Sequence, residues 1–168
     1  MIQKYLSQFL SLNTNKYAGK LAPHKPILLL SVLDMYENGR LADNKIELSE
    51  DLEKTFVSNW KRYIGDIPFY RPNVDKPFWH MKNEAFWTLK SKTSGSLDSI
   101  RNPYSIRRLR ENVYAEIDSE LSALLKKDYE RDLLRKALIE RYLKVYSTAV
   151  VSKVSSVFLM SLLTHIAS

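Results

Sequence analysis

A nearly uninterrupted apolar segment follows a short charged loop close to the start of the chain. The segment reads Ala22-Pro-His-Lys-Pro-Ile-Leu-Leu-Leu-Ser-Val-Leu-Asp34. Pro26 suits the first helical position, where its missing N–H would have no partner in any case. Apolar side chains then cover nearly the whole circumference of a helix over residues 25–38, and Gly39 follows as its stop. This pattern predicts a buried central helix around which the rest of the domain must pack.

The charged loop before this helix has two interpretations. His24 and Lys25 stand beside the free backbone N–H groups of the helix start. N–H groups of this kind, with cations next to them, make a ready site for an anion. Alternatively, Pro-His-Lys-Pro is only a stiff beginning for the helix. The segment alone leaves both interpretations open.

The charge balance favours an anionic partner. The chain has 168 residues with 26 Lys and Arg against 19 Asp and Glu, a net charge of +7. An excess of this size indicates a polyanion, and nucleic acid first of all. Cysteine is absent, which excludes disulfides and thiolate metal sites and favours the reducing cytosol, so we expect a cytoplasmic protein. The first twelve residues are amphipathic, unlike a signal peptide, and we expect no membrane span.

The periodicity of the chain predicts a mostly helical domain with a small sheet. We expect helices over residues 2–12, 25–38, 49–64, 102–110, 118–126 and 129–146, and strands over 45–48 and 112–117. The aromatic-rich runs 78–82 and 86–89 flank a short turn and predict an antiparallel β-hairpin, with His80 and Trp79 on opposite faces. The order of elements predicts an α+β fold with a winged-helix-like core.

The chain divides into one domain, residues 1–146, and an apolar C-terminal tail, residues 147–168, whose role the sequence does not define. The tail carries Val150, Val151 and Val154 among other apolar residues, too many to form one patch in water. We therefore expect it to dock on a surface, for example as the interface of a homodimer.

Enzymatic chemistry is disfavoured. The three histidines are far apart, the carboxylates lie mostly next to Lys or Arg, and no nucleophile or phosphate-loop motif occurs. We expect no catalytic residues, no metal and no cofactor. Arg107 and Arg108, with Arg101 and Arg110, form a basic cluster that is either a solvated face or a patch that contacts phosphates.

Two motifs together resemble a known family. They are the segment Ala22-Pro-His-Lys-Pro-Ile-Leu-Leu-Leu and, about fifty residues later, Lys76-Pro-Phe-Trp-His-Met-Lys-Asn-Glu-Ala-Phe-Trp87. The pair is similar to the N-terminal DNA sulfur-binding domain of HNH restriction endonucleases that act on phosphorothioate-modified DNA. The resemblance covers roughly residues 1–145. It implies a domain that holds duplex DNA and receives, in a small nonpolar pocket, the sulfur that replaces a non-bridging phosphate oxygen.

The resemblance assigns roles to several residues. His24 and Lys25 match the loop that approaches the DNA backbone, Pro77 matches the proline that helps to form the sulfur pocket, and His80 follows on the next strand. The flanking cations that would hold the remaining phosphate charge are Arg71, Lys76, Lys82, Arg107 and Arg108. Many relatives have Tyr immediately before the pocket proline, whereas this chain has Lys76, whose ammonium offers any phosphate an ion pair.

The interpretation that we adopt from the sequence is a reader of modified duplex DNA of a bacterial defence system, in which the HNH nuclease module is absent from this chain. One alternative is a winged-helix regulator that ignores modification and places residues 49–64 in the major groove. A second alternative is a domain that binds protein, for which the basic charge would be incidental.

Overall fold

The computed structural model describes residues 1–147, so nearly all of the predicted tail lies outside the described residues. The helices are α1 (Ile2–Leu10), α2 (His24–Glu37), α3 (Glu50–Tyr63), α4 (Asp75–His80), α5 (Ile106–Asn112), α6 (Ser119–Leu125) and α7 (Asp128–Leu138). The strands are β1 (Lys16–Tyr17), β2 (Lys20–Leu21), β3 (Lys45–Glu47), β4 (Trp87–Ser91) and β5 (Val113–Ile117). The α+β fold predicted from the sequence is confirmed.

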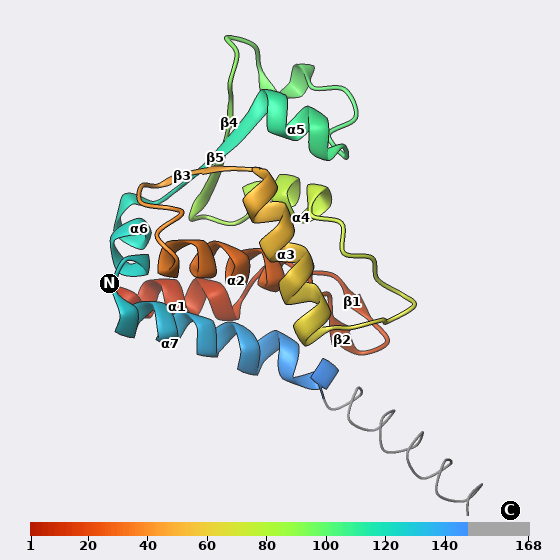
Figure 1. Cartoon of the computed structure of the whole chain (residues 1–168), viewed down its shortest axis with the longest axis vertical. Helices are drawn as coiled ribbons and strands as arrows, with labels where there is room; N and C mark the ends of the chain where they lie inside the picture. Colours follow the sequence, from red (N-terminus) through yellow and green to blue (C-terminus); the bar gives the residue numbers. More distant parts are fainter. Residues whose placement is uncertain (148–168) are drawn as a thin grey trace, which may run out of the picture.

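Helix α2 is the centre of the domain, as its apolar circumference predicts. Helices α3, α4, α6 and α7 all pack against it (Figure 1). Ile27, Leu28 and Leu33 are fully buried. One polar contact crosses the core, because Asn59 of α3 donates to the Ser31 hydroxyl at 3.2 Å and to Asp34 at 2.8 Å. These bonds satisfy the buried polar groups and fix the register of α3 on α2.

The larger sheet is antiparallel, with the strand order β3-β5-β4. Inward and outward residues alternate along the central strand β5, where Val113, Ala115 and Ile117 are buried. In chain order, the core elements are α2, β3, α3, α4, β4 and β5. The first of these strands, β3, pairs with the third, β5, which agrees with the winged-helix-like core expected from the sequence. The connection from β4 to β5 carries α5 and projects from the body of the domain (Figure 1).

Helix α7 changes its winding near its end. Residues Ile139–Leu143 form a π-helical turn, after which the helix continues to residue 147. The turn brings both Tyr142 and Tyr146 into the core. The Tyr142 hydroxyl donates to the carbonyl of Phe9, and the Tyr146 hydroxyl donates to the carbonyl of Leu21. The end of α7 thereby fastens α1 and the β1–β2 hairpin to the domain.

The predicted hairpin over residues 78–89 is wrong in its first half. Residues 75–80 form helix α4, residues 81–83 form a 3₁₀ turn, and β4 pairs with β5 instead. Phe78, Trp79 and Met81 are all buried, which the alternation of a strand would not allow. Pro77 is the third residue of α4, a position where its missing N–H breaks no helical bond. His80 consequently lies on a helix rather than on a strand.

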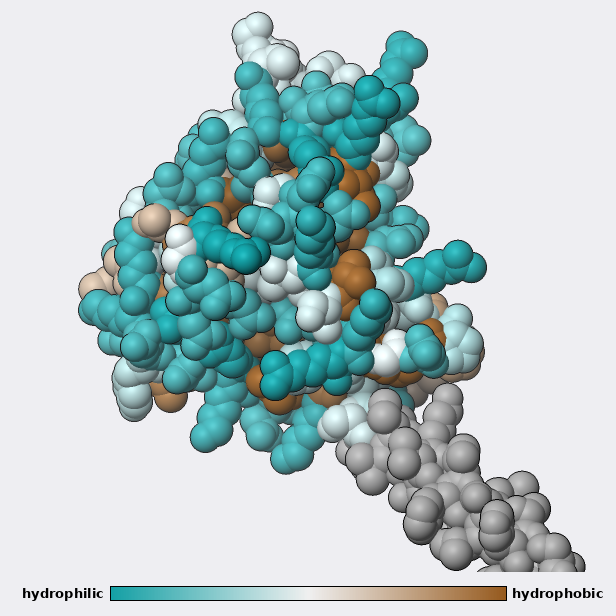
Figure 2. Space-filling view, in the orientation of Figure 1, coloured by the Kyte–Doolittle hydropathy of each residue, from teal (hydrophilic) through white to brown (hydrophobic). Residues whose placement is uncertain are grey.

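Smaller differences concern the ends of elements. Helix α2 begins at His24, so Pro26 is its third residue rather than its first. Helix α5 begins only at Ile106, where the Ser105 side chain caps it by accepting the backbone N–H of Arg108, and Asn102 adopts a positive φ of 54° that a helix excludes. The β1–β2 hairpin was not expected at all. Over residues 1–147, no helix is both long and apolar enough to cross a membrane, and the visible face is largely hydrophilic (Figure 2).

Candidate nucleic-acid interface

A cavity of about 800 Å³ opens where the β1–β2 hairpin, the start of α2, and α4 meet. It gathers five of the residues that the sequence assigned to DNA binding: His24, Lys25, Lys76, Pro77 and His80. The remaining lining residues were not expected there, namely Asn13, Thr14, Asn15, Lys16, Tyr17, Ala22, Tyr70 and Asn83. The two motifs on which the resemblance depends therefore lie on the same cavity.

The first turn of α2 contributes His24 and Lys25 to the cavity lining. The first hydrogen bond of the helix runs from the N–H of Ile27 to the carbonyl of Pro23 at 2.9 Å. The N–H groups of His24 and Lys25 precede that bond, so the helix itself offers them no acceptor. The positive end of the helix dipole lies at the same place. These features favour an anion at the cavity.

His24 is held in an aromatic environment. Its ring lies 4.7 Å from the ring of Trp60 and 5.3 Å from that of Tyr70, measured between centroids. Its Nε2–H donates to the carbonyl of Arg71 at 3.0 Å, because a carbonyl oxygen can only accept. Burial lowers the pKa of His24 below its ordinary value of 6.5, and the charge of Lys76 lowers it further. The ring is therefore neutral at pH 7, and protonation would turn Nδ1 into a second donor.

Lys25 is a buried cation with its charge already paired. Its ammonium donates to Glu84 Oε1 at 2.5 Å and to the carbonyl of Asn13 at 2.7 Å. The Lys25 and Glu84 side chains are 9% and 8% exposed. Glu84 also accepts the backbone N–H of Asn13 at 3.0 Å. An ammonium has three donors, so one remains for a ligand, and the pair fixes Asn13 at the cavity wall.

Helix α4 supplies the contrasting wall. Pro77 is buried and lines the cavity, whereas Lys76 next to it is exposed. The Lys76 ammonium lies 5.7 Å from the centre of the Tyr104 ring. One turn of α4 thus places an apolar ring next to an exposed cation. The ring can accommodate the less hydrated part of an anion, and the cation can bind its charge.

His80 lies one turn beyond Pro77 on α4. It shares a hydrogen bond of 3.1 Å with the hydroxyl of Tyr104, which belongs to the projecting β4–β5 connection. Burial lowers the pKa of His80, and the charges of Lys25, Lys82 and Lys76 lower it in turn. Three lysines that all act on one imidazole define a region of positive potential.

Four residues assigned from the sequence lie away from the cavity wall. Arg71 reaches it only through its carbonyl, which binds His24. Lys82 lies over the ring of Trp79 at 4.3 Å from its centre. Arg107 pairs with Glu111 at 3.0 Å, and Arg108 donates to the carbonyl of Arg101 at 2.6 Å, both on the exposed surface of α5. These four cations are not part of the cavity lining.

The cavity residues that the sequence did not predict come mostly from residues 13–22. The signal that could have found them is the segment Lys16-Tyr-Ala-Gly-Lys20, in which Gly19 sits between residues suited to short strands. Among residues 1–147, no group of His, Asp or Glu side chains could hold a metal ion.

The domain has a winged-helix-like α+β fold, and its cavity combines cations with a proline. This combination is suited to an anionic ligand. A family model described as "ScoMcrA-like, DNA sulfur-binding domain" matches residues 2–155. The chain belongs to this family. A solved structure described as "Sulfur binding domain of SprMcrA complexed with phosphorothioated DNA" has a similar fold, with a TM-score of 0.60 and 18% sequence identity over 84% of this chain and 85% of that one. No curated protein matched.

Proposed function

We propose that this chain reads duplex DNA in which one phosphate carries a sulfur, and that the cavity between α2 and α4 receives the modified phosphate. The supporting observation is that Pro77 lies in the same cavity as the exposed cation Lys76 and the first turn of α2. Sulfur is larger and less well hydrated than oxygen, so an apolar ring favours it. The cations and the helix start bind the charge that both kinds of phosphate share.

Each residue of the cavity has a distinct part in this proposal. The N–H groups of His24 and Lys25 bind the phosphate oxygens, and Pro77 contacts the sulfur. Lys76 adds an ion pair that does not distinguish sulfur from oxygen. His80 stands at the rim, where Tyr104 orients it. Sulfur preference therefore depends on Pro77, whereas overall affinity depends on the cations.

The projecting connection extends the interface beyond the cavity. The side chain of Arg107 is 87% exposed, and its ion pair with Glu111 is of a surface kind that contributes little. Arg110 is different, because it binds Glu53 at 2.6 Å and the Leu48 carbonyl at 2.7 Å and so ties α5 to α3. Arg107 and Arg108, with Arg71 and Lys82, bind neighbouring phosphates and add affinity without sequence information.

The experiment compares variants on two duplexes that differ by one phosphorothioate. Pro77→Ala removes the ring and leaves a good helix former, so it should reduce the preference for the sulfur-bearing duplex severalfold with little effect on the plain duplex. Lys76→Tyr should raise the preference, because it removes an ion pair open to any phosphate. Pro72→Ala, in the exposed part of the loop before α4, is the matched control.

Equal losses on both duplexes for Pro77→Ala would contradict a sulfur pocket. If Lys76→Tyr changes the affinity for DNA and Pro77→Ala does not, the chain is instead a DNA-binding domain that ignores the modification. Circular dichroism of each variant establishes that α4 is retained.

Two further parts of the proposal concern the whole chain. Genomic DNA as the partner implies the cytoplasm as the compartment. Residues 147–168 are proposed as a homodimer contact because of their valine-rich sequence. Sedimentation of the full chain and of a chain that ends at residue 147 tests this second part, which fails if both sediment as monomers.

A further inference from the structure

Two aromatic rings from distant parts of the sequence meet on the surface beside the cavity. Tyr17 of β1 and Phe69 of the loop before α4 have ring centroids 5.1 Å apart with an angle of 43° between the rings. They are 52% and 66% exposed. Most of the large aromatic side chains in residues 1–147 are buried in the core. An exposed pair of this size marks a surface for a ligand.

The pair is supported from beneath. Tyr17 also contacts Tyr70 edge to face at 6.4 Å, and Tyr70 in turn contacts His24. The hairpin that carries Tyr17 turns at Ala18 and Gly19, both with positive φ, so that Tyr17 pairs directly with Lys20. Tyr146 holds the next residue of β2 through its hydrogen bond to the Leu21 carbonyl. These contacts hold Tyr17 in position before a ligand arrives, which reduces the entropy lost on binding.

The surroundings of the pair are cationic. Lys16 precedes Tyr17, Lys20 faces it across the hairpin, and Arg71 follows Tyr70 in the loop. Within residues 1–147, these three cations form no ion pair. Tyr17 is at the same time part of the cavity wall. A ligand that covers the rings must therefore combine a flat apolar face with negative charge and must reach the cavity.

We propose that Tyr17 and Phe69 form a stacking site for the face of a nucleobase in the same DNA whose phosphate occupies the cavity. The inference rests on the proposed function and adds a second ligand subsite to it. Bases stack on aromatic side chains in this way with little dependence on sequence. A paired duplex hides its base faces, so the site takes a base at a strand end, at a gap or at an opened step.

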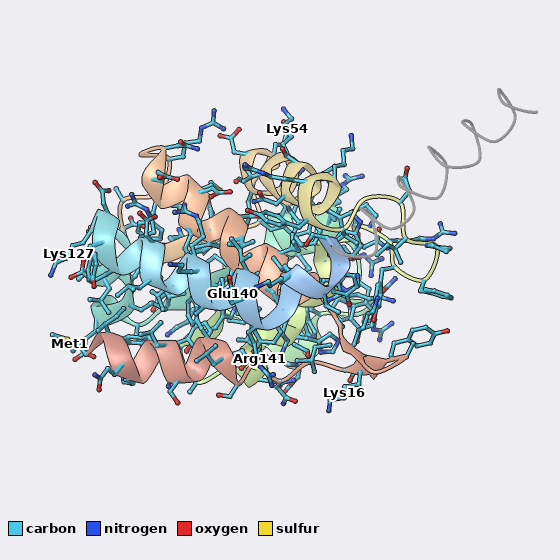
Figure 3. The ribbon with its side chains drawn as sticks, turned by 90° about the horizontal axis from the view of Figure 1, so that it is seen from below. Met1, Lys16, Lys54, Lys127, Glu140 and Arg141 are labelled. Carbon is cyan, nitrogen blue, oxygen red and sulfur yellow. The ribbon has the colours of Figure 1, made fainter. Side chains whose placement is uncertain are left out.

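The charge pattern argues against a protein partner for this surface. Lys16 precedes Tyr17 in the sequence, Lys20 pairs with it across the hairpin and Arg71 follows Tyr70, and this concentration of positive charge favours a polyanionic ligand. Basic grooves with interspersed aromatic rings are typical of proteins that bind exposed nucleotides. Figure 3 shows Lys16 at the end of the molecule opposite Met1 and Lys127. An exposed tyrosine near Lys127, Tyr129, is thus a matched control far from the site.

The test uses the full chain and two duplexes with the same single phosphorothioate. One duplex is continuous, and the other exposes one 2-aminopurine in a single-nucleotide gap, placed in a series of positions next to the modified phosphate. Tyr17→Ala and Phe69→Ala should each weaken binding to the gapped DNA by about tenfold or more and remove the quenching of 2-aminopurine fluorescence. Tyr17→Phe and Tyr129→Ala should retain both, and Phe69→Ala, whose residue does not line the cavity, should leave binding of the continuous duplex nearly unchanged.

Each other outcome has a definite meaning. If the wild-type chain binds gapped and continuous DNA equally at every position, or if Phe69→Ala loses equally on both, the stacking site is wrong while the proposed function stands. If the wild-type chain binds neither DNA, the proposed function fails as well. If the Ala variants abolish self-association of the chain and leave DNA binding intact, the pair is a protein contact and the inference is overturned.

Discussion

The Lys25–Glu84 pair shows how a single residue can serve the site and the fold at once. A lysine ammonium at a phosphate site would ordinarily contribute its full charge, but here the Glu84 carboxylate neutralises it at 2.5 Å. The pair also orders Asn13 through two hydrogen bonds. We infer that the free positive charge of the cavity comes from Lys76 and the helix start, while Lys25 mainly shapes the wall.

This view of Lys25 predicts a large effect on stability. Lys25→Met leaves the buried Glu84 carboxylate without its partner, which should lower the free energy of unfolding by about 3–5 kcal/mol. Lys25→Met combined with Glu84→Gln should recover most of that loss, since the amide oxygen still accepts the Asn13 N–H. Urea denaturation of both variants is the measurement. A loss below about 1 kcal/mol for the single variant would show that the pair is not buried as described.

The two histidines predict a dependence of DNA affinity on pH. Burial and neighbouring lysines lower the pKa of both His24 and His80 in the free domain. A bound phosphate favours the protonated rings and raises these pKa values, so binding takes up protons. Affinity should therefore increase as the pH falls from about 7.5 to 5.5, by up to tenfold for each pKa unit gained. His80→Gln should flatten the profile measured by anisotropy, and an affinity that rises with pH would contradict this account.

At the scale of elements, sequence patterns predicted some parts of the fold and site well and others poorly. The apolar circumference of α2 and the periodicity over residues 49–64 predicted α2 and α3, and the two motifs predicted five of the residues that meet at the cavity. Helix α4 was missed because Phe78 and Trp79 have high strand propensity. In the folded domain the ring of Phe78 packs against the ring of Trp87, with 5.6 Å between the centroids, and contacts of this kind favour the helix. The secondary-structure propensity of a short segment cannot predict a contact that forms only in the folded core.

The β1–β2 hairpin was missed for a different reason. A two-residue turn with positive φ at both positions usually carries Asn-Gly, but this turn carries Ala18 with φ of 49° and Gly19 with φ of 76°. Alanine is strained in the left-handed region, so its presence concealed the turn. The unexpected cavity residues, Lys16 and Tyr17, depend on this hairpin.

The strain at Ala18 predicts a stabilising substitution. Ala18→Asn places a residue that tolerates the left-handed region in an open turn and should raise the free energy of unfolding by about 1 kcal/mol. Gly19→Ala, next to it, should lower the free energy of unfolding instead, although no atom lies within 4 Å of the added carbon. Thermal unfolding of the two variants measures both. A destabilised Ala18→Asn domain would mean that the turn has another conformation.

At the scale of the whole molecule, the net charge and the cavity act on different aspects of binding. The +7 charge attracts any DNA, and its contribution falls as the salt concentration rises, because the release of counterions from the DNA then gains less free energy. Phosphate and phosphorothioate carry the same charge, so this contribution cancels when the two are compared. What remains is the contact of Pro77 with sulfur or oxygen, a short-range effect that salt does not screen. Affinity and preference are therefore separable by experiment.

The measurement that tests the central claim most directly is the affinity of the wild-type chain for one duplex with and without a single phosphorothioate, at two salt concentrations. We predict that the modified duplex binds about tenfold more tightly, a difference of ~1.4 kcal/mol. Both affinities should fall as salt rises, and their ratio should stay constant. Equal affinities for the two duplexes, or a ratio that vanishes with salt, would contradict the assignment of this cavity to the sulfur of modified DNA.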